Sequence, residues 1–358
     1  MMTPHGTVET PAFMTIATAG AVKGVTVGQL ETLGCPIILA NTYHLHLRPG
    51  AEAVERLGGL HRFMGWGGPI LTDSGGYQVF SLAELNRIDD DGVTFRSHVD
   101  GQQLRLDPER ATAIQNQLGG DVIMAFDQCV ELPADRGRLA EAVERTLRWA
   151  RRCRAAHRRD GQALFGIDQG GLDADLRRRC LDGLLEIGFD GYAVGGLSVG
   201  ERRDEMLGVL DGLAPHLPVE RPRYLMGVGM PHDIAAAVAR GIDLFDCVLP
   251  TRNGRNAFAF TDGGAVRLRN ARYRLDERPL EPGCECPTCR RHTRAYLRHL
   301  FGTREMLGPV LVSVHNIAYY QRLMARIRRA VDEGRLARLV EDLQRTWRAG
   351  PAADEDDE

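Results

Sequence analysis

The hydrophobic positions along this chain gather into short apolar runs, most of which end at a polar residue or a glycine. Seven runs have this form, and they lie at residues 37–40, 70–72, 122–126, 163–167, 191–194, 223–226 and 242–249. Between some of them lie longer segments with helical periodicity, such as residues 138–157 and 172–187. Alternating strands and helices predict a parallel sheet whose functional edge lies at the carboxyl ends of the strands.

Seven strand–helix units in a chain of 358 residues favour a closed barrel over an open, doubly wound sheet. We therefore predict an α/β fold, an eight-stranded (β/α) barrel of the TIM type. The eighth strand is weakly marked in the sequence, and residues 256–260 fit it best.

The composition narrows the class of protein. The chain is 43% hydrophobic, enough for a large core, and its net charge of −3 means that any contact with nucleic acid must come from a local basic patch. No apolar run reaches the length of a membrane span and no signal pattern opens the chain, so we expect a cytoplasmic protein without a membrane partner. Five scattered cysteines argue against a disulfide scaffold, and they are Cys35, Cys129, Cys153, Cys180 and Cys247.

Residues 241–256, GIDLFDCVLPTRNGRN, combine one acid with two arginines. Asp246 lies near the end of the predicted strand, and Pro250 stops that strand because proline cannot donate to a sheet. A tight turn is expected to follow, with Arg252 and Arg255 around Asn253. Such a group suits chemistry on a polyanion, since guanidinium groups pair with phosphate oxygens. The alternative is that Asp246 caps the next element and the arginines are solvated.

A second candidate site is the segment TDSGGYQ, which begins at Thr72. A strand delivers Asp73 into a glycine turn, where main-chain amides are accessible to a ligand. Phosphate-binding turns have a similar appearance. Two aspartates at strand ends, Asp73 and Asp246, are typical of glycosyl transfer, in which one carboxylate attacks the anomeric carbon and the other handles protons.

Cys284, Cys286 and Cys289, followed by His315, have the composition of a closed Cys₃His site for Zn²⁺. Four protein ligands leave no open coordination position, so one structural zinc per chain is expected. The arginines around this motif form either a basic face or an ordinary solvated surface. We divide the chain into a barrel core (residues 1–270), a zinc-binding subdomain with carboxyl-terminal helices (271–350) and a disordered acidic tail (351–358).

At this point the sequence resembles a known family. The motifs TPHGTVETPAFM, NTYHLHLRPG, TDSGGYQVFSL, FDQC, DQGG, YAVGGLSVGE, LMGVG, FDCVLPTRNGRN and CECPTC…HN run in order from about Thr3 to about Arg338 and are similar to those of the bacterial-type tRNA-guanine transglycosylases. The resemblance implies replacement of the wobble guanine in the tRNA anticodon by 7-aminomethyl-7-deazaguanine, a step of queuosine biosynthesis. It also implies a homodimer.

The resemblance implies roles for individual residues. Asp246 is expected to be the nucleophile in a double displacement through a covalent enzyme–RNA intermediate, and Asp73 the general acid and base. Residues expected to bind the base are Asp73, Ser74, Gly75, Gly76, Tyr77, Asp127, Gln169, Gly196, Leu197 and Met226. Residues expected to contact the anticodon loop are Gly227, Val228, Gly229, Met230, Pro231, His232, Asp233, Thr251, Arg252, Asn253, Gly254 and Arg255.

Two departures and one steric feature stand out against the family pattern. Asp168 occupies a position where an apolar residue is expected, which would place a charge at the pocket edge. Ala257 and Phe258 replace a glycine and a polar residue. Val199 is expected to narrow the pocket wall beside Cys129, so that the small aminomethyl base fits and the bulkier queuine does not.

Two other kinds of protein were weighed against this enzyme. A non-catalytic tRNA-binding subunit would be expected to lose Asp73 or Asp246, and both are present. An unrelated barrel glycosidase would need neither the zinc motif nor a purine pocket.

Overall fold

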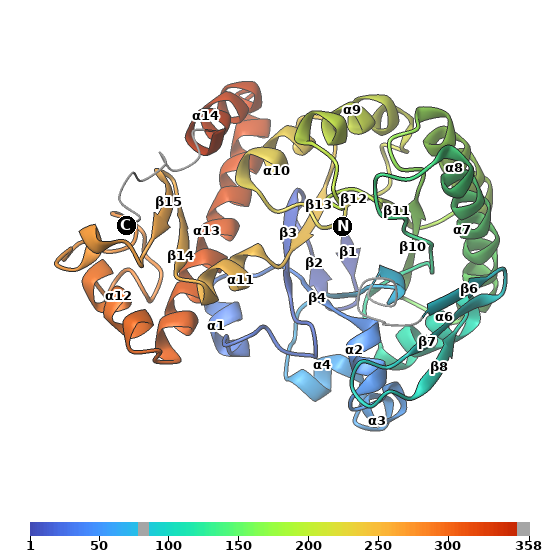
Figure 1. The fold of residues 1–358 in the computed structure, drawn as a ribbon, viewed down its shortest axis with the longest axis horizontal. Coiled ribbons are helices and arrows are strands. Elements are labelled where there is room, and N and C mark those ends of the chain that lie inside the picture. The colour runs from blue at the N-terminus through green and yellow to red at the C-terminus, as the bar shows by residue number, and fades with distance from the viewer. Residues whose placement is uncertain (78–85, 349–358) are drawn as a thin grey trace.

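The computed structural model describes residues 1–77 and 86–348, and its larger part is a closed barrel of eight parallel strands surrounded by helices (Figure 1). This confirms the predicted fold class. In the order in which they neighbour each other, the barrel strands are β10 (Ala163–Asp168), β11 (Gly191–Val194), β12 (Arg223–Leu225), β13 (Leu244–Cys247), β3 (Ala12–Ile16), β4 (Ile38–Ala40), β5 (Ile70–Thr72) and β9 (Val122–Met124).

The eighth strand is not where the sequence suggested. β3 closes the barrel by pairing with β13 on one side and β4 on the other. Residues 256–260 instead contribute to β14 (Phe258–Thr261), which pairs only with β15 (Gly264–Arg267) in an antiparallel hairpin. The hairpin cannot join the barrel because β3 already supplies the partner that β13 needs.

The two longest helices outside the barrel strands in this part of the chain begin at side-chain caps. Both segments predicted as amphipathic helices are confirmed, as α7 (Arg136–Ala156) and α8 (Ala174–Ile187), and the side chains of Asp135 and Asp173 cap them. The other helices of this part are α1 (Val27–Thr32), α2 (Thr42–Leu47), α3 (Ala51–Arg56), α4 (Gly59–Met64), α6 (Pro108–Leu118), α9 (Arg203–Leu213), α10 (Pro231–Val238) and α11 (Leu249–Arg255).

Alternate residues of the strands fill the barrel. Ala12 and Met14 of β3 point into the interior cluster, whereas Phe13 packs outward against the helices. This alternation is the period of two expected of strands. A three-stranded sheet, β6 (Asn86–Asp89), β7 (Gly92–Arg96) and β8 (Gln103–Leu106), is inserted between β5 and α6.

The amino-terminal end of the barrel is covered by the short hairpin of β1 (Met2–Thr3) and β2 (Gly6–Thr7). His5 in this hairpin and His61 in α4 both bond the carboxylate of Asp121, at 2.7 and 3.1 Å. The two imidazole rings are stacked, with 14° between their planes. The carboxylate of Asp121 therefore links the amino-terminal hairpin to α4.

The carboxyl-terminal part lies beside the barrel, in orange and red in Figure 1. It contains the β14–β15 hairpin, α12 (Arg294–Gly302), α13 (Leu307–Asp332) and α14 (Leu336–Arg348). The long helix α13 packs against α11, β14 and the barrel strand β3, and therefore joins the two parts. The predicted acidic tail, residues 351–358, lies outside the described residues, as do residues 349–350.

Within residues 1–77 and 86–348, no helix combines the length and the apolar character needed to cross a membrane.

Candidate functional site

Asp73 stands directly after β5, at the carboxyl end of the barrel, and is almost entirely buried. Its carboxylate accepts a hydrogen bond from the Asn41 side chain and another from the main-chain amide of Thr42, the latter at 2.8 Å. The Thr42 hydroxyl in turn donates to the Asp73 carbonyl oxygen at 2.5 Å. The start of α2 therefore fixes both the side chain and the main chain of Asp73.

Asp246 lies at the same end, within β13, and is 8% exposed. One carboxylate oxygen accepts hydrogen bonds from the Tyr224 hydroxyl at 2.5 Å and from the Gly227 amide at 2.8 Å. Burial raises the pKa of Asp246, and these two donors oppose the rise because they stabilise the carboxylate. The pKa of Tyr224 is raised well above its usual value by burial and by the charges of Asp246 and Asp73, so its hydroxyl stays a donor.

A third buried acid lies across the barrel mouth from Asp246. Asp127, just after β9, accepts hydrogen bonds from the Ser74 hydroxyl at 3.3 Å and the Gln169 side-chain amide at 2.8 Å. Burial raises the pKa of Asp127 to about 6 despite these two donors. A Cβ at Gly76 would lie 3.0 Å from the Asp127 carbonyl oxygen, so a side chain there would crowd the main chain of Asp127.

The remaining residues expected to bind the base surround this group. Gly75 and Gly196 have positive φ angles, 79° and 64°, and any side chain at Gly196 would collide with Gln169 Oε1. Leu197 is buried in the core, Met226 is half-buried and Tyr77 is 52% exposed. The barrel thus brings Asp73, Asp127, Gln169 and Asp246 to one end, with Tyr77 at its surface.

Residues 227–233 and 251–255 have a more internal position than a binding loop usually has. Of the residues expected to contact RNA, Gly227 and Arg252 are exposed, Met230, Asp233, Asn253 and Arg255 are half-buried, and Val228, Gly229, Pro231, His232, Thr251 and Gly254 are buried. A Cβ at Gly229 would collide with Cys247, and one at Gly254 would lie 2.5 Å from Ser313 Oγ of α13. Gly229 therefore permits close packing against the Cys247 side chain, and Gly254 permits close approach to α13.

The predicted tight turn after Asp246 is wrong, because residues 249–255 form the helix α11. Pro250 ends the strand ladder, but proline is also favoured in the first turn of a helix. Arg252 and Arg255 therefore lie on one helix face. The pKa of Arg255 is lowered by burial and by the Arg252 charge, and Arg255 Nη1 is a buried donor without a partner among the described residues. Two neighbouring guanidinium groups have the chemistry that pairs with phosphate oxygens.

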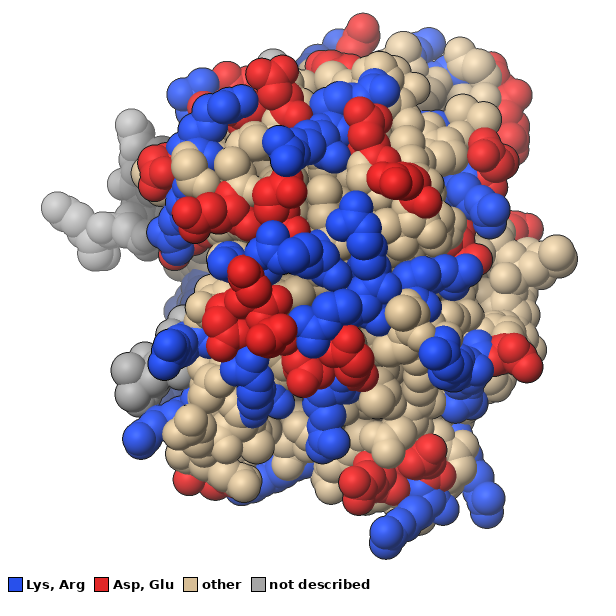
Figure 2. Space-filling view, turned by 90° about the vertical axis from the view of Figure 1, so that its right-hand side faces the viewer, with Lys and Arg blue, Asp and Glu red and all other residues tan. Residues whose placement is uncertain are grey.

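The molecular face at the right of Figure 1 is also rich in arginine, but there the charges are mixed (Figure 2). Between α7 and the β6–β8 insertion, Arg148 pairs with Asp90 at 2.5 Å. Arg152 of the same helix pairs with Glu109 at 2.6 Å. The arginines of α7 are thus partly neutralised by neighbouring acids.

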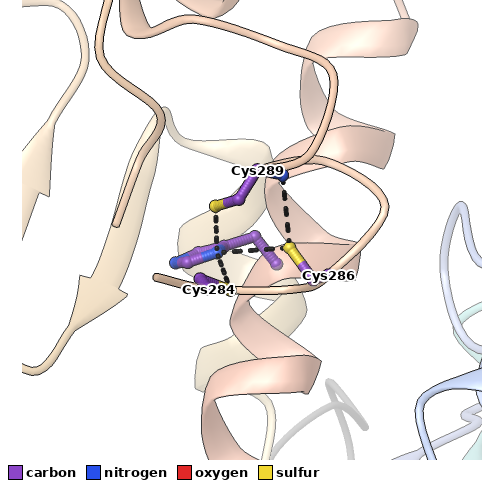
Figure 3. A group of neighbouring side chains, drawn as sticks. Cys284, Cys286 and Cys289 are labelled. Carbon is purple, nitrogen blue, oxygen red and sulfur yellow. Dashed lines mark hydrogen bonds between the residues drawn. The ribbon is translucent and has the colours of Figure 1, made fainter. Parts of the chain in front are cut away.

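The four predicted metal ligands converge between a loop and α13 (Figure 3). The sulfurs of Cys284, Cys286 and Cys289 lie 3.8, 3.6 and 3.3 Å from Nδ1 of His315. Tetrahedral zinc with its usual bond lengths separates sulfur and nitrogen ligands by roughly 3.5 Å. Nε2 of His315 lies 2.8 Å from the Phe260 carbonyl oxygen, which holds the ring so that Nδ1 faces the sulfurs. The cluster suits a structural zinc, as predicted.

Comparison with known proteins identifies the family to which this chain belongs. A family model described as queuine tRNA-ribosyltransferase matches residues 1–349. A queuine tRNA-ribosyltransferase of Nitrosomonas eutropha is 57% identical over 330 residues, 92% of this chain and 91% of that protein. One of Azotobacter vinelandii is 54% identical over 338 residues, 94% of this chain and 91% of that protein. This chain belongs to the queuine tRNA-ribosyltransferase family. The resemblance seen in the motifs is thereby confirmed.

The structure shows the environment of two residues that depart from the pattern expected of a queuine tRNA-ribosyltransferase. Asp168 does not lie at the pocket edge as predicted, because its side chain is fully buried and pairs with Arg177 at 2.9 Å. Ala257 has a φ of 64°, a left-handed conformation that favours the glycine expected there.

Three residues that bond Asp73 or Asp246 are not predicted as site residues from the sequence. Asn41 and Thr42 bond Asp73, and Tyr224 bonds Asp246. Asn41 had a signal, because it directly follows a predicted strand. Tyr224 had none, since a tyrosine inside an apolar run reads as a core residue.

Proposed function

We propose that this protein is a tRNA-guanine transglycosylase that replaces the wobble guanine of tRNA with 7-aminomethyl-7-deazaguanine. An Asp246 oxygen attacks C1′ of the ribose, and the bond to N9 of guanine breaks with its electron pair leaving on the base, which Asp73 protonates. The incoming base, deprotonated by Asp73, attacks C1′, and Asp246 leaves as a carboxylate. Two displacements preserve the configuration at C1′.

The hydrogen bonding of Asp246 is the observation that best supports this proposal. Tyr224 and Gly227 both donate to the same oxygen, Oδ1, so among the described residues Oδ2 accepts no hydrogen bond and remains available for attack. The two donors also orient the carboxylate at a rigid strand end. Asp73 is held by a separate element, α2, so the two acids are positioned independently.

Base recognition is proposed for Asp127, Gln169 and Gly196. Asp127 would accept hydrogen bonds from the N1 and exocyclic amino groups of the purine, while the Gln169 side chain and the Gly196 amide would donate to its carbonyl oxygen. A base lacking these groups would leave the remaining lone pairs of a buried carboxylate without donors, and this penalty provides selectivity. Tyr77 and Met226 are proposed to stack on the two ring faces.

The anticodon loop is proposed to bind along α11 and residues 227–233, with Arg252 and Arg255 on its phosphates. The guanine must leave its stack to reach acids this deep in the barrel mouth. We further propose the domain division given above and a homodimer. The free thiols of Cys35, Cys129 and Cys153 agree with a reducing, cytoplasmic setting.

Exchange of labelled guanine into bulk tRNA tests the proposed function. Purified protein should incorporate the label into acid-insoluble RNA, and excess 7-aminomethyl-7-deazaguanine should prevent or reverse incorporation. Absence of incorporation by zinc-loaded protein would contradict the proposal.

A further inference from the structure

A buried ion pair lies behind the base pocket and has no part in the reaction described above. Arg177 in α8 is 2% exposed and Asp168, the last residue of β10, is fully buried. Nη1 of Arg177 donates to Asp168 Oδ2 at 2.9 Å. Burying two charges costs free energy that their attraction only partly returns, so such a pair calls for an explanation beyond stability.

The Arg177 guanidinium holds the main chain on both sides of Gln169. Nη1 also donates to the carbonyl oxygen of Asp168, and Nε donates to that of Gly171, each at 2.9 Å. The same helix supplies a third contact, because the Gln169 amide donates to the sulfur of Cys180 at 3.3 Å. Residues 168–171 are therefore fastened to α8 from behind.

The opposite side of these residues is the pocket. A Cβ at Gly195 would lie 2.7 Å from Gln169 Nε2, so the side chain of Gln169 is pressed against that main chain while it donates to Asp127. A Cβ at Gly196 would lie 3.7 Å from Arg177 Nη2, a buried donor without a partner among the described residues. The guanidinium thus stands immediately behind the two groups assigned to the purine carbonyl.

We propose that Arg177 is the positioning residue of the base pocket and that Asp168 compensates its buried charge. This inference rests on the proposed function. The planar guanidinium of Arg177 fixes residues 168–171 as one unit. Gln169 is therefore held beside Asp127 and Gly196 before the base binds, so that binding loses less conformational entropy. Base affinity then depends on the bonds of Arg177 to the main chain, whereas stability depends on the charge balance of the pair.

The experiment measures the Kd of zinc-loaded protein for 7-aminomethyl-7-deazaguanine by calorimetry without tRNA, the Kd for tRNA by gel retardation, and the urea midpoint. The double variant Asp168→Val/Arg177→Met removes both charges and all of the Arg177 donors. We expect it to fold with a urea midpoint near that of the wild type, to bind the base at least tenfold more weakly and to bind tRNA within twofold.

Asp168→Asn gives the converse result, because Arg177 keeps its two carbonyl partners but loses its counter-charge. We expect a lower urea midpoint and a base Kd within threefold of the wild type. Arg178→Met, which removes the next arginine of α8 from an exposed position, is the matched control and should change none of the three measurements.

A merely structural pair would make base affinity follow stability across these variants. The inference is overturned if the double variant binds the base like the wild type, or if Asp168→Asn loses as much base affinity as the double variant. Failure of the wild type to bind the base or to exchange guanine would remove the proposed function and this inference together.

Discussion

Replacing Asp127 by asparagine should make the protein more stable and less functional at the same time. Burial raises the pKa of Asp127 from 3.8 to about 6, so at pH 7 the folded state holds a carboxylate that water would solvate better. A shift of this size corresponds to about 3 kcal/mol, at about 1.4 kcal/mol per pKa unit. Asparagine still buries a polar amide, so we expect a gain in unfolding free energy of roughly 1–3 kcal/mol at pH 8.

The pH dependence of the unfolding free energy shows whether the buried charge of Asp127 is the cause. Between pH 4 and 6 the folded state holds the Asp127 proton more tightly than the unfolded state, so the stability that Asp127 contributes falls as the pH rises and is constant above about 6. The asparagine variant lacks this fall. Its advantage over the wild type should therefore shrink by about 1.4 kcal/mol from pH 8 to pH 5, which urea unfolding at both pH values can measure.

The same variant should bind the free base at least ~100-fold more weakly. The purine presents two donors, N1 and the exocyclic amino group, and asparagine replaces one of the two accepting oxygens by a donor. Asp107→Asn, the same chemical change at the cap of α6, should retain its cap and leave the affinity for the base unchanged. An advantage of Asp127→Asn that does not vary with pH, or lower stability at every pH, would refute this account of the buried charge.

Three further outcomes are expected. Asp246→Asn should bind tRNA but give no denaturation-resistant protein–RNA band, and a band equal to that of the wild type would exclude Asp246 as the nucleophile. Val199→Gly should raise the use of queuine relative to the aminomethyl base in a competition for one labelled tRNA, because it removes an isopropyl group from the proposed pocket wall; comparable use of both bases by the wild type would contradict the steric argument. Elemental analysis should find one zinc per chain, and Cys286→Ser should lose the metal and loosen the region from β14 to α13 in hydrogen exchange, since closed sites contribute folding energy; full activity without zinc would be the contrary result.

The barrel could be predicted from the sequence because most of its strands are apolar runs that end at polar residues. β3 was missed for a physical reason. It is the first barrel strand in the chain, so no helix precedes it to mark its start, and its five residues directly follow Pro11. Residues 256–260 fit the pattern of an eighth barrel strand better, because apolar alternation does not reveal whether a strand joins a barrel or a separate hairpin.

Part of the candidate site can likewise be predicted from the sequence, and part cannot. Acids at strand ends, such as Asp73 and Asp246, can be found from the pattern, since the topology carries the carboxyl ends of parallel strands to one face. Their partners depend on contacts between distant segments, as the bonds of Tyr224 to Asp246 and of Arg177 to Asp168 illustrate. Local patterns contain no trace of such contacts.

Because α13 connects the Cys₃His cluster to the barrel, it limits where residues can be inserted into this chain. Three residues of α13 serve both parts: His315 faces the cysteines, Asn316 donates to the carbonyl oxygens of Pro250 and Phe258, and Tyr320 donates to that of Gly229. One residue inserted before His315 would turn the rest of the helix by about 100°, taking these side chains from their partners together. Insertions should therefore be tolerated in the β6–β8 region, whose tips lie at the surface, and excluded from α13, where the metal fixes the rotation of a helix that supports the loops beside Asp246.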